Sequence, residues 1–258
     1  MAAPRPPLPT LLERLQSRWW ALVLPLSIVV VISAVALSSA SARFLTYLAL
    51  IAVPPLAAAA LAWIVRGGRP PLAALVIPLF ALAWAGEGAL GGQAAALALS
   101  ALACISLGWL VAGVVPSRWL KLGIYAMAAV DAYLVATDLL QAPNAVLNTA
   151  APAGGLPRLQ LAAFGSAVMG FGDLFVAATL GALLAGYSRR LQLRGAAVAA
   201  VLCVSFDFLF FAVDELPSTV PIALTLAALE LRGRLDANDE SGNHGGQHGH
   251  PADDHRLL

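Results

Sequence analysis

Long apolar runs separated by short polar segments dominate the chain. Eight such runs stand out, at residues 19–40, 44–65, 71–87, 93–115, 119–141, 159–187, 191–213 and 217–232. A bilayer core about 30 Å thick needs about 20 apolar residues per helix, and the short connecting segments are rich in Arg, Gly or Pro. The pattern therefore predicts an all-α polytopic bundle of about eight transmembrane helices.

Composition supports lipid as the solvent. Hydrophobic residues make up 60% of the chain and charged residues only 11%, whereas soluble domains carry about 25% charged residues. The segment 36–42 resembles a signal-peptide cleavage site. The apolar run before it, from Trp19 to Ala40, exceeds the usual signal core of about 7 to 15 residues, so we interpret it as a retained first span.

Basic residues are distributed asymmetrically around the predicted spans. If the N-terminus is cytoplasmic, the inner side holds Arg5, Arg14, Arg18, Arg66, Arg69, Arg118, Lys121, Arg189, Arg190, Arg194, Arg232 and Arg234. The outer side then holds Arg43 and Arg158. Because positive charge accumulates on the cytoplasmic side, this predicts an integral membrane protein of a bacterial plasma membrane with both termini in the cytoplasm.

We divide the chain into three parts. Residues 1–118 hold the N-terminal segment and four spans, 119–232 the candidate catalytic core, and 233–258 a His- and Asp-rich cytoplasmic tail expected to be disordered. The tail carries all four histidines, His244, His248, His250 and His255. Metal binding there is an alternative, although nothing pre-organises the ligands. Cys104 and Cys203 lie in apolar runs, so neither a disulfide framework nor a Cys-based metal site is expected.

Acidic residues inside the spans are the main candidates for chemistry. A carboxylate at membrane depth costs at least about 2.5 kcal/mol, so each one suggests a function. Asp131, Asp173 and Asp207 lie well within predicted spans. The acids nearer predicted span ends are Glu87, Asp138, Asp214 and Glu215.

Asp131 and Asp173 are expected at the same membrane level. They lie about 18 Å and 21 Å from the inner ends of successive antiparallel helices, at 1.5 Å per residue. Two close carboxyl groups cannot both ionise, so one stays protonated while the other acts as a base on water. Gly170 and Gly172 remove side chains beside Asp173, which lets a substrate backbone approach and an extended peptide pair there.

The run Gly170-Phe171-Gly172-Asp173 matches the G-x-G-D motif of the presenilin and signal peptide peptidase family of intramembrane aspartyl proteases. Asp131, followed by an aromatic residue at Tyr133, resembles the other catalytic helix of that family, with Val130 in place of the usual tyrosine. Pro221-Ile222-Ala223-Leu224 is similar to the family's Pro-Ala-Leu motif but contains an extra Ile.

The resemblance covers residues 119–232 and implies a presenilin-like catalytic core. It implies that Asp131 and Asp173 activate water to cleave a peptide bond in a transmembrane substrate helix, with the motif residues positioning that helix. The partners would be a membrane-protein or peptide substrate and the lipid bilayer, with no nucleic acid. No metal or cofactor is needed. The orientation resembles that of signal peptide peptidases, which implies substrates with a cytoplasmic N-terminus. The family has nine spans, against the eight counted here.

Other interpretations use the same residues. A proton-coupled transporter would employ the buried acids as a relay, in which Asp207 would join Asp131 and Asp173; in a protease Asp207 would be a supporting acid. A helix-binding relative that does not cut is a further alternative. Prepilin peptidases share G-x-G-D, but Leu174 and Phe175 stand where those enzymes usually have a lysine. The loop 141–158 is either a connector or a gate over the site.

Overall fold

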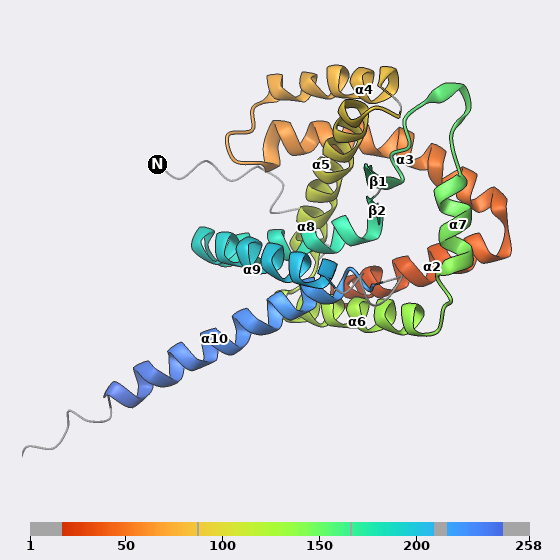
Figure 1. Ribbon diagram of the computed structural model, residues 1–258. Helices are drawn as coiled ribbons and strands as arrows, with labels where there is room; N and C mark the ends of the chain where they lie inside the picture. Colours follow the sequence, from red (N-terminus) through yellow and green to blue (C-terminus); the bar gives the residue numbers. More distant parts are fainter. Residues whose placement is uncertain (1–16, 87, 166, 209–215, 245–258) are drawn as a thin grey trace, which may run out of the picture.

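The computed structural model describes residues 17–86, 88–165, 167–208 and 216–244. Within these ranges the chain is mostly helical, with one short β-hairpin (Figure 1). The elements are η1 (Arg18–Leu22), α2 (Val23–Leu37), α3 (Ser39–Ala59), η2 (Ala60–Ile64), η3 (Pro70–Leu75), α4 (Val76–Ala85), α5 (Leu90–Val114), α6 (Ser117–Ala136), α7 (Gln141–Thr149), η4 (Ala153–Gly155), β1 (Leu161–Phe164), β2 (Ala167–Gly170), α8 (Phe171–Tyr187), α9 (Arg189–Asp207) and α10 (Val220–His244).

Four helical stretches are long and apolar enough to cross a membrane: Arg18–Ala36, Ala40–Ile64, Leu90–Val114 and Ser117–Ala136. They correspond to the first, second, fourth and fifth predicted spans. Large apolar side chains cover their outer faces, including Ile51, which is 74% exposed. Contiguous exposed apolar surface of this kind indicates a membrane protein. The count of eight spans stays a prediction, because Pro70–Ala85 and Phe171–Tyr187 are shorter apolar helices.

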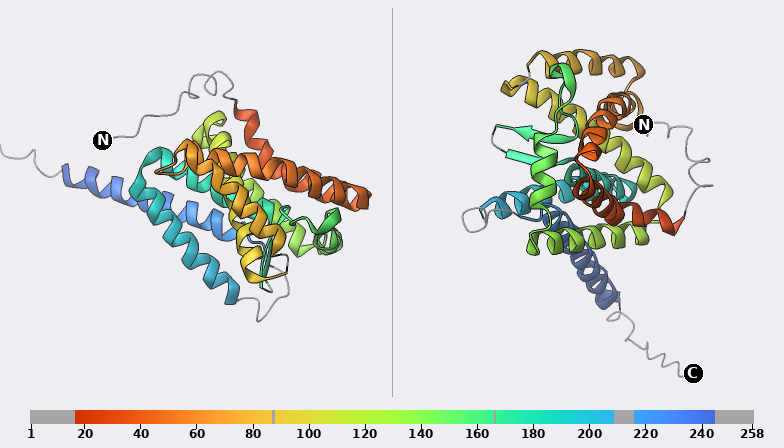
Figure 2. Two further views of the ribbon diagram at one scale, coloured as in Figure 1. Left: turned by 90° about the horizontal axis from the view of Figure 1, so that it is seen from above. Right: turned by 90° about the vertical axis from the view of Figure 1, so that its right-hand side faces the viewer.

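Helix α5 lies at the centre of the bundle, where it packs against α3, α4 and α8 (Figure 1). Helix α6 packs against α2 on one side and α10 on the other, and it also touches α8. One buried cluster joins α2, α5, α6, α8 and α10, and a second joins α3, α4 and α5. The views in Figure 2 show the helices gathered into one bundle from which α10 projects. The first cluster surrounds Asp131.

The prediction of one continuous helix over 159–187 is wrong. Residues Leu161–Phe164 and Ala167–Gly170 form an antiparallel hairpin, and the helix begins only at Phe171. The turn includes Gly165, whose φ of +62° is unfavourable for most other residues. Further upstream, Gly154 and Gly155 also have positive φ. Gly165 thus interrupts a sequence whose hydropathy alone resembles a span.

The C-terminal part also departs from expectation. Helix α10 continues to His244, although a disordered tail was predicted from residue 233. The remaining tail, 245–258, lies outside the described residues. The metal hypothesis lies outside them as well, because none of the four histidine side chains is among the described ones. The loop 141–158 contains helix α7, which packs against α2 and α3. This contact makes the loop more than an unstructured connector.

Helices α5 and α8 pack backbone against backbone at Gly108. A Cβ atom there would lie 2.7 Å from the Ala178 carbonyl carbon and from the Thr179 amide nitrogen. We therefore expect Gly108→Ala to push the helices apart and to destabilise the fold by about 1–3 kcal/mol. Thermal unfolding in detergent measures this. Gly91→Ala, on the same helix with nothing within 4 Å, is the control, and equal melting temperatures for the two variants would contradict the packing argument.

Candidate functional site

Asp131 lies on the buried face of α6. The inward face repeats at helical spacing through Ile124, Met127, Ala128 and Asp131. Only 4% of Asp131 is exposed. Its Oδ2 atom accepts two hydrogen bonds from Thr219, one from the backbone amide at 3.2 Å and one from the hydroxyl at 2.6 Å. Burial of this carboxyl group is thus accompanied by two donors from Thr219, the residue directly before α10.

Asp173 lies in the first turn of α8. The sequence interpretation put it mid-helix, but α8 begins at Phe171, so Asp173 is the third helical residue. Its Oδ2 atom accepts a hydrogen bond from the Gly170 amide at 3.1 Å. The side chain therefore ties the end of β2 to the start of α8. An acid in the first turn also suits the positive end of the helix dipole.

Ser218 and Thr219 bring the two aspartates to one place. The Ser218 side chain lies close to the Asp173 carboxyl group, while the Thr219 hydroxyl donates a hydrogen bond to Asp131. Asp173 also lies within electrostatic reach of Asp131. The start of α10 packs beside both α6 and α8 (Figure 1). Two consecutive residues thus contact acids that are 42 positions apart in the chain, counted from 131 to 173.

The segment Pro221-Ile222-Ala223-Leu224 begins half a turn after Thr219. Pro221, Ile222 and Ala223 are buried, whereas Leu224 is 44% exposed. The first three residues pack into the cluster around α6 and α8, so the segment lies next to the aspartates. The segment is helical from Val220 onward.

The three residues before Asp173 connect the hairpin to the core. Phe171 packs against both buried clusters, and its carbonyl accepts a hydrogen bond from the Cys104 thiol at 3.7 Å. Gly170 ends β2 and is exposed. A Cβ at Gly172 would meet only the Met127 Cε atom, at 3.9 Å. Space beside Asp173 is therefore open at Gly172.

Other predicted residues do not join the aspartates. Tyr133 is 62% exposed, because two residues along a helix correspond to about 200° of rotation and place it opposite Asp131. Asp207 is exposed at the end of α9, and Asp138 is exposed after α6. Glu87, Asp214 and Glu215 lie outside the described residues. A relay of Asp131, Asp173 and Asp207 is thus not formed.

Sequence reasoning missed Ser218 and Thr219 as functional candidates. Both stand directly before a helix that starts near a proline, which is the pattern of hydroxyl residues at a helix N-terminus. That pattern predicts bonding to the helix's own amides, whereas here Thr219 bonds the Asp131 carboxyl group of α6 and the Ser218 side chain lies close to Asp173 of α8. Among the residues described by the structure, no group of three or more His, Cys, Asp or Glu side chains is arranged to hold a metal ion.

Comparison of the chain with protein-family models, with curated proteins and with solved structures finds no match. The function is therefore inferred from the residues of this site and from their geometry.

Proposed function

We propose that the protein is an intramembrane aspartyl protease that cleaves peptide bonds within or near transmembrane helices. The observation that carries this proposal is that the consecutive residues Ser218 and Thr219 lie beside Asp173 and Asp131, with a hydrogen bond of 2.6 Å from the Thr219 hydroxyl to Asp131. The contact occurs directly before the Pro221-Ile222-Ala223-Leu224 segment, so all three elements of the family resemblance meet. A buried Asp131 and a half-buried Asp173, both beside neutral donors, suit general acid–base chemistry better than a structural ion pair.

Hydrolysis by such a pair follows from one shared proton. The ionised carboxylate takes a proton from a water molecule, whose oxygen forms a bond to the carbonyl carbon of the peptide. The protonated carboxyl group gives its proton to the carbonyl oxygen. The tetrahedral intermediate then breaks its C–N bond as the nitrogen takes the proton that the first carboxylate removed from water. One hydroxyl group of the intermediate returns its proton to the second carboxylate, which restores the pair. The two carboxyl groups titrate as one unit, so the acid and base roles belong to the pair.

The hairpin supports a peptide substrate. All four residues of β2 are exposed, and β2 leads directly into Asp173, while β1 packs against α5. An exposed edge strand offers unpaired backbone groups to an extended peptide. A substrate strand on β2 would run toward Gly172, where a side chain is absent. We infer that the substrate unwinds locally and pairs there.

Cleavage of a labelled transmembrane peptide tests the proposal. The purified protein is reconstituted into liposomes with helical peptides of both orientations, and the products are identified by mass spectrometry. The proposal expects two fragments from a single cut and preference for the peptide oriented with a cytoplasmic N-terminus. Solute-dependent proton flux in proteoliposomes, with every peptide intact, would instead favour the transporter.

Gly172→Ala separates substrate access from folding. The added methyl group meets only Met127 at van der Waals distance, so we expect the melting temperature to stay unchanged or rise slightly. Cleavage should fall by about tenfold or more, since a substrate displaced by about 1 Å loses up to about 100-fold in rate. The rate constant and the melting temperature are measured on the same preparation. Gly181→Ala, farther along α8 with nothing within 4 Å, should leave both unchanged, whereas full cleavage by Gly172→Ala would argue against close approach of a substrate.

A further inference from the structure

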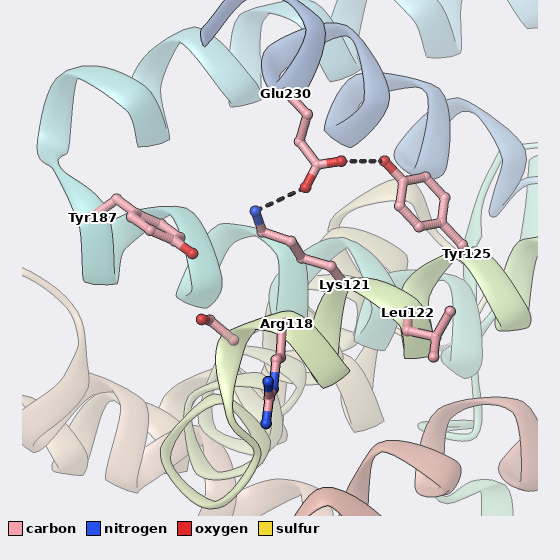
Figure 3. Close-up of a pocket in the computed structure, with 7 residues that line it drawn as sticks. Arg118, Lys121, Leu122, Tyr125, Tyr187 and Glu230 are labelled. Carbon is pink, nitrogen blue, oxygen red and sulfur yellow. Dashed lines mark hydrogen bonds and ion pairs between the residues drawn. The ribbon is translucent and has the colours of Figure 1, made fainter. Parts of the chain in front are cut away.

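Two neighbouring cavities lie beside the first three turns of α6. The first has a volume of about 390 Å³ and is lined by Arg118, Lys121, Tyr125, Tyr187 and Glu230, among others (Figure 3). The second, of about 380 Å³, lies between α6 and the η1–α2 segment. Leu122 lines both cavities, so they adjoin on the exposed side of α6. Neither is lined by Asp131 or Asp173.

Positive charge collects where the two cavities meet. The guanidinium carbons of Arg18 and Arg118 each lie 5.9 Å from the centroid of the Trp119 ring. Within the described residues, neither arginine lies within ion-pair distance of a carboxylate. Glu230 pairs with Lys121 at 2.7 Å instead, and Figure 3 shows the Arg118 side chain extending away from that pair. Arg18 and Arg118 both carry a positive charge and both approach the Trp119 ring, so a bound anion would reduce their mutual repulsion.

The second cavity is apolar. Apart from Arg18, it is lined by Trp19, Pro25, Trp119, Gly123 and other uncharged residues, and its walls belong to two of the helices that can cross a membrane. Leu122 at the junction is 54% exposed. This apolar groove runs along α6, away from the place where Arg18 and Arg118 approach Trp119, and it suits a hydrocarbon chain.

We propose that this place is a binding site for an anionic phospholipid. The phosphate is held by Arg18 and Arg118, and one acyl chain lies in the groove between α6 and η1–α2. A basic pocket joined to an apolar groove suits a phospholipid better than a soluble phosphate, because the groove gives hydrocarbon a surface that a soluble anion does not use. Two arginines select an anionic lipid over a zwitterionic one. This site is independent of the proposed proteolysis.

Native mass spectrometry of the full chain in detergent tests the site with three probes: phosphatidylglycerol, phosphatidylcholine and inorganic phosphate. We expect phosphatidylglycerol to bind at least about fivefold more tightly than phosphatidylcholine, since each nearby arginine adds about that factor. Inorganic phosphate should neither bind detectably nor displace the lipid. Binding of phosphate equal to that of phosphatidylglycerol would overturn the lipid assignment in favour of a soluble anion.

Variants locate the site. Arg18→Gln with Arg118→Gln should weaken phosphatidylglycerol binding by about 20-fold, and Ala126→Trp, which fills the groove without changing charge, should also weaken it. The control removes the same charge from the exposed Arg66 and Arg69, and it should bind as the parent does. Equal loss in the control, or full binding by the Arg18/Arg118 variant, would overturn the proposal. If the double variant does not fold, Arg118→Gln and Ala126→Trp carry the same test.

Discussion

Replacing either Asp131 or Asp173 with asparagine is expected to reduce peptide cleavage by at least about 100-fold. Asparagine keeps the size of the side chain but can neither hold the shared proton nor act as a base, and general acid–base catalysis contributes about 10²- to 10⁴-fold. The two single losses should be about equal, and the double variant should lose little more, because both groups act as one unit. Initial rates on the labelled peptide measure this.

Asp138→Asn is the matched control for these variants. Asp138 is exposed just after α6, and its φ of +56° is a conformation that asparagine adopts readily. Its cleavage rate and melting temperature should equal those of the parent protein. A surviving rate in Asp131→Asn or Asp173→Asn, with the variant folded, would exclude the dyad as the source of catalysis.

Thr219→Val is expected to cause the second largest loss. Thr219 is fully buried, and its hydroxyl lies 2.6 Å from Asp131 Oδ2. Valine keeps the shape but removes this donor, so the carboxyl group retains only the backbone amide of residue 219. We expect about 1–3 kcal/mol of destabilisation and a fall in cleavage of about tenfold or more as Asp131 loses its position.

Two variants test this explanation. Thr219→Ser keeps the hydroxyl and should recover most of the activity. Thr225→Val removes an equally buried hydroxyl from the same helix, but that group bonds the Pro221 carbonyl at 2.8 Å rather than an aspartate. Its cleavage rate should stay near that of the parent, as measured beside the melting temperature. A loss of activity in Thr225→Val as great as in Thr219→Val would show that packing of α10, and not the bond to Asp131, sets the rate.

The sequence predicts the helical class and the most apolar helices well. Four of the predicted runs form helices long enough to span a bilayer, because about 20 consecutive apolar residues leave the backbone few other ways to satisfy its hydrogen bonds in lipid. The inward position of Asp131 is also explained by the sequence, since a carboxyl group within an apolar helix turns toward polar partners inside the bundle, here Thr219. Its pairing with Asp173 stays a prediction.

The hairpin before Asp173 is the feature that hydropathy misses. Leu161 to Phe164 and Ala167 to Gly170 are as apolar as a span, and their strand structure depends on the Gly165 turn and on contact of β1 with α5. A hydropathy average uses only neighbouring residues in the chain, so it does not include a tertiary contact of this kind. The roles of Ser218 and Thr219 were missed for the same reason, because a bond across 88 residues leaves no local pattern.

The separation of the Asp131 and Asp173 carboxyl groups in an experimental structure tests the central claim most directly. The dyad predicts that one oxygen of each group lies within reach of a single water molecule, about 5.5 Å apart or less, as two hydrogen bonds of about 2.8 Å allow. Ser218 and Thr219 should contact one aspartate each. Carboxyl groups that point into separate cavities, with the 218–219 segment away from both, would contradict the account.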